Sequence, residues 1–364
     1  MTMQSDSYVS QQTFTVRPML VAIVVVSVSL SASVGFGQKD NIYRKGKRGG
    51  NSLVRGKVVA TSAFKVTIDD NGSQKEIPAS EINKISFAGE PRNIGRARDH
   101  LESDRFDDCL KTLAKIDEAP KSKFAKQEMQ YLEAMASGKK SLRGDPAITT
   151  QAAEQLVGGF VKSNSDSYRL VPVVELYAQL LVANGKTQQA QKEFNKLTKS
   201  QWEDYELRGH FYEGETLVHQ GNFASAKKSY QALAGMDGSS ANARQYKLLA
   251  TCQLAKIAAL EGNFEPAIAQ LEKIIQDENA DNTKLFASAY NALGTCYVKS
   301  GDLKKACRAF LHTELLFPTE ADAHAEALYN LTQIWPQLKE TERANRAREL
   351  LTTRYRSSIW ASKL

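Results

Sequence analysis

Residues 290–318 read YNALGTCYVKSGDLKKACRAFLHTELLFP, and this stretch decides the fold. Apolar residues recur in it every three or four positions on both sides of Gly301, which is the period of an amphipathic α-helix. Glycine readily takes the left-handed backbone conformation that ends a helix. Asp302, directly after it, carries a side-chain oxygen that can cap the next helix. The stretch therefore predicts two antiparallel helices joined by a short turn.

The same pattern occurs three more times upstream. The glycines that interrupt it are Gly185, Gly221, Gly262 and Gly301. Five residues after each glycine come Ala190, Ala226, Ala267 and Ala306. Large residues follow four positions later at Phe194, Tyr230, Leu271 and Phe310, and three positions beyond those at Leu197, Leu233, Ile274 and Thr313. We expect each alanine to lie where the two helices of a pair approach most closely, and each large residue to fill the space toward the next pair.

The turns add a second regularity. Besides Asp302, the residues Asn222 and Asn263 directly follow a turn glycine, so we expect them to cap the helices that begin there. Agreement at several offsets in four copies indicates an internal repeat of helical hairpins.

These spacings and residue types resemble the tetratricopeptide repeat (TPR) family. The best copy matches the family at Tyr290, Leu293, Gly294, Tyr297, Gly301, Ala306, Phe310 and Pro318, whereas Thr313 replaces a usual alanine. Weaker copies are expected at Ala97–Ile116, with Asp104 and Cys109 in the glycine and alanine places, around Gly144, and at Glu340–Tyr355. The resemblance implies a mainly α protein, a TPR-like α-solenoid of about seven antiparallel helix pairs over residues 93–360.

The resemblance also implies a concave groove lined by the first helix of each pair. The family's groove positions fall on Glu175, Gln179, Arg208, Phe211, Glu215, His219, Cys252, Lys256, Asn291, Thr295 and Lys299. Charges of both signs occur in this set. The resemblance implies that the partner is a protein or peptide. The Lys and Asn residues with which some TPR proteins clamp a terminal carboxylate are not reproduced. The alternative is that these are simply solvated residues of a structural solenoid.

The amino-terminal segment has the features of an export signal. Residues 19–34 read MLVAIVVVSVSLSASV after Arg17, and the apolar core of 12 residues is short for a membrane span, which needs about 20. We predict a signal peptide over residues 1–37, cleaved between Gly37 and Gln38, and a protein of the periplasm or cell envelope. An uncleaved signal anchor is the alternative. Residues 38–50, which include RKGKR at 44–48, are expected to form a flexible basic linker.

Residues 51–90 have the pattern of a small β module. Asn71-Gly72 separates two runs of β-forming residues, and this pair favours a tight hairpin because both turn positions need positive φ. Four or five short strands in so few residues would close most easily as a small barrel. Residues 55–59 and 81–85 resemble SH3-like or Sm-like barrels. So small a module buries little surface, and we therefore expect it to pack on the following helices.

Composition and charge exclude several classes of protein. The chain has 364 residues, 42% of them hydrophobic and 24% charged, which excludes a wholly disordered chain and a polytopic membrane protein. The net charge of +7 is concentrated at the ends, with +4 in residues 39–50 and +4 in residues 339–364. A nucleic-acid groove needs a continuous cationic stripe, so no nucleic acid is expected. The alternative function is a tether whose basic ends contact a membrane surface or an anionic envelope polymer.

Signatures of catalysis are missing from the sequence. The five histidines show no paired metal-ligand spacing, and no nucleophile elbow, P-loop or dinucleotide fingerprint occurs. The carboxylates lack the apolar context that marks an acid–base pair. Cys296 and Cys307 fall on the two helices of one repeat, where buried thiols are favoured over the alternative, a disulfide. We expect no enzyme, no metal and no cofactor.

The layout resembles exported TPR proteins of bacteria, planctomycetes in particular. The sequence thus predicts a signal segment, a β-barrel-like module and a TPR-like solenoid that acts as a non-enzymatic interaction scaffold.

Overall fold

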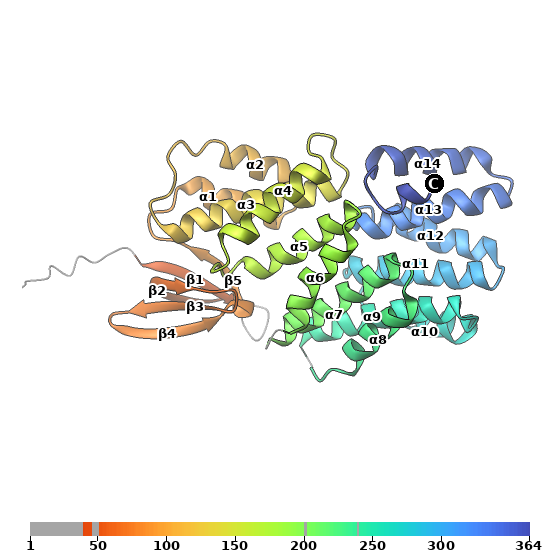
Figure 1. Ribbon diagram of the computed structural model, residues 1–364, viewed down its shortest axis with the longest axis horizontal. Helices are drawn as coiled ribbons and strands as arrows, with labels where there is room; N and C mark the ends of the chain where they lie inside the picture. The colour runs from red at the N-terminus through yellow and green to blue at the C-terminus, as the bar shows by residue number, and fades with distance from the viewer. Residues whose placement is uncertain (1–38, 46–50, 200–201, 239) are drawn as a thin grey trace, which may run out of the picture. The chain divides into compact units, whose positions relative to one another are not determined.

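The computed structural model describes residues 39–45, 51–199, 202–238 and 240–364. Within them, a small antiparallel β-sheet is followed by α-helices arranged in antiparallel pairs (Figure 1). The predicted signal segment, its cleavage site and residues 46–50 of the predicted linker lie outside the described residues. None of the helices in the described ranges is both long enough and apolar enough to cross a membrane.

The β-sheet has five strands in the described part of the chain. They are β1 (Asp40–Lys45), β2 (Asn51–Thr61), β3 (Lys65–Asp70), β4 (Ser73–Pro78) and β5 (Ile82–Ser86), with a 3-10 turn η1 (Ala79–Glu81) before β5. The order across the sheet is β4-β3-β2-β1-β5, and all neighbours are antiparallel. Asn71 and Gly72 join β3 to β4 with φ of 56° and 87°, which confirms the predicted hairpin.

The prediction of a flexible basic linker is wrong for residues 40–45. These residues form β1, which lies in the sheet between β2 and β5 and pairs Ile42 with Val54 on one side and Ile85 on the other. The side chain of Ile42 is fully buried, and the Asp40 carboxylate accepts hydrogen bonds from the amides of Val58 (2.7 Å) and Ala88 (2.6 Å). The buried side chain of Ile42 and the hydrogen-bonded carboxylate of Asp40 therefore stabilise a strand here despite the basic composition of the segment.

The sheet is open where a closed barrel was predicted. Among the described residues β4 and β5 pair on one side only, so the resemblance to SH3-like and Sm-like barrels is not confirmed. The core of the module, which includes Ile68 and Ile85, extends to Ala125 and Tyr168 of the helical region. The Thr61 hydroxyl also donates to the carbonyl of Asp166 at 2.7 Å. The expectation that the module packs on the helices is confirmed.

The helical region in the described ranges has fourteen α-helices. They are α1 (Arg92–Glu102), α2 (Phe106–Leu113), α3 (Lys123–Leu142), α4 (Thr150–Ser163), α5 (Leu170–Ala183), α6 (Thr187–Thr198), α7 (Glu203–His219), α8 (Phe223–Gly235), α9 (Ala241–Leu260), α10 (Phe264–Asp277), α11 (Thr283–Lys299), α12 (Leu303–Leu316), α13 (Ala321–Gln337) and α14 (Thr341–Arg354), followed by a 3-10 turn η2 (Ala361–Lys363). Each helix packs on the next, and odd-numbered helices also pack on one another, as α9 does on α11. This is a TPR-like α-solenoid.

The turn inside every pair uses the same backbone conformation. Positive φ occurs at Asp104, Gly144, Gly185, Gly221, Gly262, Gly301 and Lys339. The first helix of each pair therefore ends on a left-handed residue, as predicted for the glycines and for Asp104. Lys339, which is exposed, shows that a residue other than glycine can also take this conformation.

Two details of the predicted repeat need correction. Asn222 and Asp302 cap their helices, since their side chains accept from the amides of Ser225 (3.2 Å) and Lys305 (3.0 Å), but the side chain of Asn263 makes no cap bond. The large residue of the second helix packs on both sides and not only toward the next pair: Phe194 of α6 stacks on Tyr212 of α7 in the next pair, with 5.2 Å between the ring centroids, whereas Tyr230 of α8 also packs within its own pair. A Cβ on Gly214 of α7 would lie 2.5 Å from the ring of Tyr230 on α8. Glycine is therefore needed there to admit the ring.

Candidate functional site

The first helices of the pairs face a common cavity of about 630 Å³. Helices α5, α7, α9, α11 and α13 contribute to its lining, and the polar or aromatic residues on it include Gln179, Phe211, Glu215, His219, Lys284 and Asp322. The connection between α3 and α4 and the C-terminal residues Thr353–Ile359 complete the wall. The predicted groove is thus closed in part by segments that the repeat pattern did not implicate.

The closure depends on a contact between the second and the last helix pair. Arg354, at the end of α14, donates from Nε to the carbonyl of Arg143 at 3.4 Å and from Nη2 to the carbonyl of Pro318 at 3.0 Å. Gly144 lies so close to the Arg354 carbonyl that a Cβ there would collide with it. The turn at Gly144 therefore serves this contact as well as its own helix pair.

The predicted groove residues divide into three groups. Those that line the cavity are Gln179, Phe211, Glu215 and His219. Those that form interactions along the first helices are Glu175, Arg208, Lys256 and Thr295, while Lys299 is exposed outside the cavity. Cys252 and Asn291 are buried, with exposed fractions of 0% and 1%, so their prediction as partner contacts is wrong. Asn291 instead donates to the carbonyl of Ala323 at 2.8 Å and joins α11 to α13.

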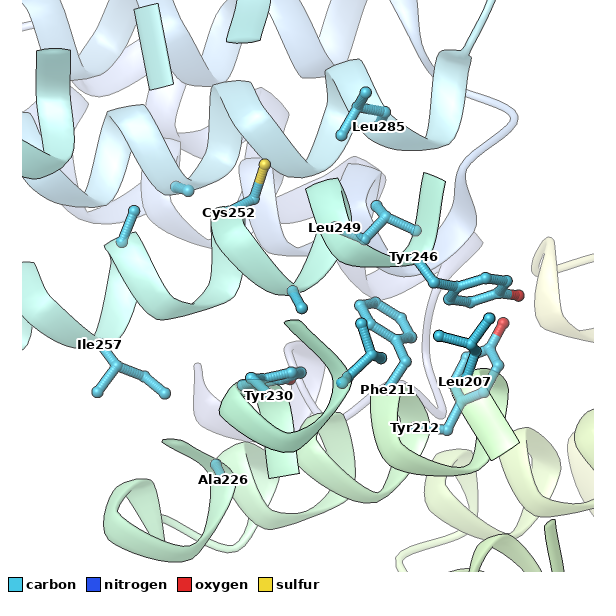
Figure 2. Close-up of a cluster of buried hydrophobic side chains, with 14 of the residues drawn as sticks. Leu207, Phe211, Tyr212, Ala226, Tyr230, Tyr246, Leu249, Cys252, Ile257 and Leu285 are labelled. Atoms are coloured by element: carbon cyan, nitrogen blue, oxygen red, sulfur yellow. The ribbon is translucent and has the colours of Figure 1, made fainter. Parts of the chain in front are cut away.

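A cation and three aromatic rings form the first functional cluster of the cavity. The Lys284 ammonium donates to the Tyr212 hydroxyl at 2.7 Å and lies 4.9, 5.4 and 5.6 Å from the ring centroids of Tyr212, Phe211 and Tyr246. Figure 2 shows these three rings gathered together, with Tyr230 on the other side of Phe211. We call Lys284, Phe211, Tyr212 and Tyr246 the aromatic–lysine cluster. The Lys284 ammonium can bind a negatively charged or carbonyl group, and the rings beside it offer apolar surface.

Sequence analysis missed Lys284, although a signal for it exists. Lys284 precedes the predicted groove residue Asn291 by seven positions, which is two helical turns on nearly the same face. Extending the groove pattern toward the start of the helix would have found it.

An ion pair lies beside the aromatic–lysine cluster. Arg208 of α7 contacts Glu175 of α5 at 2.8 Å between Nη1 and Oε2, with the guanidinium also 5.9 Å from the Tyr246 ring centroid. Burial alone would raise the pKa of Glu175, but Arg208 and then Lys284 outweigh it and lower the pKa below its usual value. Glu175 therefore stays ionised, and it forms a charged pair with Arg208 next to the aromatic–lysine cluster.

A second cluster joins α7 to α13. One side-chain donor atom from each of Glu215, His219 and Asp322 lies within 4.8 Å of the others. Burial, and next the Asp322 carboxylate, raise the pKa of Glu215 to about 7, and burial lowers the pKa of His219. The expectation that no carboxylate lies in an apolar setting is wrong for Glu215. The sequence shows that Glu215 and His219 are four residues apart, but only the fold brings Asp322 close to them.

The C-terminal segment covers this second cluster. Trp360 is buried, its ring lies 6.0 Å from His219 and 5.7 Å from Tyr329, and its indole N–H donates to Asp322 at 3.0 Å. The Lys256 ammonium, paired with Glu326, lies 5.7 Å from the same ring. No feature of the repeat pattern predicts that the end of the chain enters the face formed by the first helices.

The four cysteines are buried free thiols, in keeping with the favoured prediction. Cys296 and Cys307 form no disulfide. Burial raises the pKa of Cys109 and Cys252 to about 12, and that of Cys296 and Cys307 to about 11. Such thiols are core residues and not nucleophiles.

Comparisons with known proteins agree with this architecture. No curated protein matches the sequence. A Rap protein complexed with Competence and Sporulation Factor has a TM-score of 0.51 at 14% identity, over 75% of this chain and 76% of that one. A tetratricopeptide repeat protein from Parabacteroides merdae ATCC 43184 scores 0.48 at 15% identity, over 72% and 92% of the two chains. NprR in complex with its cognate peptide NprX scores 0.45 at 12% identity, over 74% and 80%.

The sequence itself matches a family over its central repeats. Residues 174–313, from α5 to α12, match the family described as Tetratricopeptide repeat-like domain. This range contains four of the helix pairs, and the aromatic–lysine cluster lies within it. Residues 174–313 are therefore similar to a tetratricopeptide repeat-like domain, and they lie within a longer TPR-like α-solenoid.

Proposed function

We propose that this protein is a non-enzymatic scaffold that binds an extended peptide or protein segment in the cavity lined by α5, α7, α9 and α11. The observation that carries the proposal is the aromatic–lysine cluster on the face formed by the first helices. Aromatic side chains and charged groups at the centre of a recess supply most of the binding energy in protein interfaces. The cavity volume lies within the range of about 300–1,000 Å³ that is common for ligand sites.

The charge pattern defines the kind of peptide that fits. Lys284 lies on α11 and Arg208 on α7, with the first helix α9 between them, and Glu175 of α5 pairs with Arg208. A segment with an acidic side chain or a backbone carbonyl opposite Lys284, and an apolar side chain against Phe211 and Tyr212, would be recognised at both points. A Rap protein with this fold forms a complex with Competence and Sporulation Factor, so the fold is compatible with holding such a factor.

The predicted export signal supports a location in the periplasm or cell envelope, and this location is part of the proposal. The proposal that the protein is not an enzyme is supported by the fold, because helical repeats of this type present surfaces for binding.

The basic C-terminal region gives less support to a polymer or membrane tether. Arg343 stacks over the ring of Trp335 at 4.9 Å, and Arg354 is engaged by two backbone carbonyls. Cations that already bond within the fold offer less charge to a surface, so the cavity is the better candidate.

The proposal is tested with a peptide library displayed on phage and selected against the full chain. A selected peptide is then synthesised with a fluorophore, and its affinity is measured by fluorescence polarisation. Lys284→Ala and Gln179→Ala should each weaken binding at least about fivefold, as expected for residues worth more than 1 kcal/mol. Phe211 is a poor choice because it is buried, with 3% exposed, and its removal would disturb the core.

The matched control is Lys273→Ala. Lys273 is an exposed lysine of α10, on a second helix and outside the cavity. Binding by this variant should equal that of the unchanged chain. Selection of no peptide, or equal losses in Lys273→Ala and Lys284→Ala, would contradict binding in the cavity.

A further inference from the structure

Three metal-binding side chains meet on the wall of the cavity. Glu215 and His219 are four residues apart on α7 and so lie on one face of that helix. Asp322, in the first turn of α13, brings a third donor atom within 4.8 Å of theirs. We propose that Glu215, His219 and Asp322 bind a divalent transition-metal ion, and that Zn²⁺ is the ion that suits the set best.

The charge around the three residues favours a cation. Among the described residues neither Glu215 nor Asp322 forms an ion pair, although the two carboxylates lie close together. The nearest ammonium that faces them, Lys256, is paired with Glu326, and Lys363 lies over the Trp360 ring at 4.1 Å. Mutual repulsion of the carboxylates is part of what raises the pKa of Glu215. A metal ion between them would relieve the repulsion of the two carboxylates.

The imidazole supplies an independent observation. His219 Nδ1 is buried and has no hydrogen-bond partner among the described residues. Buried polar atoms nearly always have a partner, so an unpaired ring nitrogen beside two carboxylates calls for one. A ring nitrogen of a neutral imidazole is a common metal ligand, so a bound ion would supply the missing partner.

Outer contacts already orient two of the ligands. The Tyr230 hydroxyl donates to Glu215 Oε1 at 2.9 Å, and the indole N–H of Trp360 donates to Asp322 Oδ1 at 3.0 Å. Each carboxylate keeps its second oxygen for the ion. Hydrogen bonds of this kind fix the direction of metal ligands and strengthen the site.

The donor types select the metal. One imidazole nitrogen and two carboxylate oxygens suit Zn²⁺ and similar ions, whereas Ca²⁺ and Mg²⁺ prefer oxygen ligands throughout. Three protein ligands leave a fourth tetrahedral position open, and all three residues line the cavity. The inference does not depend on peptide binding, because the metal would join α7 to α13 with or without a peptide.

The test is a Zn²⁺ titration of the full chain, produced without a histidine tag, in competition with a chromophoric chelator at neutral pH. We expect one ion per chain. His219→Gln and Asp322→Asn should each lower the affinity at least about tenfold, since loss of a ligand costs no less than loss of an outer contact.

The control is His210→Gln on the same helix. His210 lies 3.8 Å from Glu213, which makes a His–carboxylate pair without a third ligand. This variant should bind Zn²⁺ as the unchanged chain does. Absence of stoichiometric binding, or equal losses in His210→Gln and His219→Gln, would overturn the proposal.

A second readout locates the ion. The Trp360 ring lies against His219, so Co²⁺ at the site should quench the fluorescence of Trp360, and His219→Gln should abolish this quenching. Asp322 is exposed, and Asp322→Asn is therefore expected to fold even if the His219 variant does not. Quenching that persists in folded Asp322→Asn at the same Co²⁺ concentration would refute the assignment of the ligands.

Discussion

Glu128 holds the junction between the β-sheet and the helices, and replacing it with glutamine is the most informative perturbation of the fold. Its carboxylate accepts from Arg98 Nε at 2.8 Å, from Arg169 Nη2 at 2.9 Å and from the Tyr168 hydroxyl at 2.9 Å. Arg169 also donates to the carbonyl of Asn83 in β5 at 3.3 Å. Glu128 is 1% exposed, and Arg98 is 3% exposed.

The magnitude of the effect follows from the pKa of this carboxyl group. Burial by itself would raise the pKa of Glu128, but Arg169 and Arg98 outweigh it and lower the pKa from 4.5 to about 2. A shift of this size corresponds to about 3 kcal/mol of stability. Glu128→Gln would leave the buried guanidinium of Arg169 without its counter-charge and Arg98 with Glu90 alone, and breaking a buried ion pair in this way typically costs about 3–5 kcal/mol. We therefore expect the variant to lose about 3 kcal/mol or more.

The pH dependence has a definite sign. Because the folded pKa of Glu128 lies below the unfolded value, its contribution is present above about pH 4.5 and is lost as the pH falls toward 2. The assay is urea unfolding of the full chain at pH 7 and at a series of lower pH values. Glu133→Gln, at an exposed position on the same helix, is the matched control and should change stability by less than about 0.5 kcal/mol. A loss below about 1 kcal/mol at pH 7, or an unchanged acid sensitivity, would refute the reasoning.

Two further predictions concern the repeats and the core. Asn222→Ala should lower the free energy of unfolding, measured by thermal denaturation, by about 1 kcal/mol because Asn222 caps α8. Asn263→Ala should lower it by less, since Asn263 makes no side-chain cap bond. Equal losses of stability in the two variants would contradict the assignment of the caps. The four thiols should be inert to a thiol reagent in the native chain at pH 8 and should all react in denaturant, because burial raises the pKa of each, with Cys252 fully buried; a thiol that reacts at once in the native protein would contradict its burial.

The candidate site was predictable only in part. Gln179, Phe211, Glu215 and His219 line the cavity as the repeat positions implied, because one face of a helix follows from residue spacing. Cys252 and Asn291 share that spacing but are buried where neighbouring helices touch. How far a residue is buried by a neighbouring helix cannot be predicted from the sequence of its own helix alone. Lys284 lines the cavity next to Tyr212, to whose hydroxyl it donates a hydrogen bond. The two residues belong to different helix pairs, so the spacing within one pair does not predict this contact.

The sequence by itself determined the features that depend on single residues and their near neighbours. Positive φ at Gly301, the cap at Asp302 and the hairpin at Asn71-Gly72 are local properties of the backbone, so the repeat of helical hairpins could be predicted from them. Only the tertiary structure placed residues 40–45 in the middle of the sheet and Trp360 against His219. These arrangements depend on contacts between residues far apart in the chain. Such contacts can form, and stabilise the fold, only once the segments between them have folded.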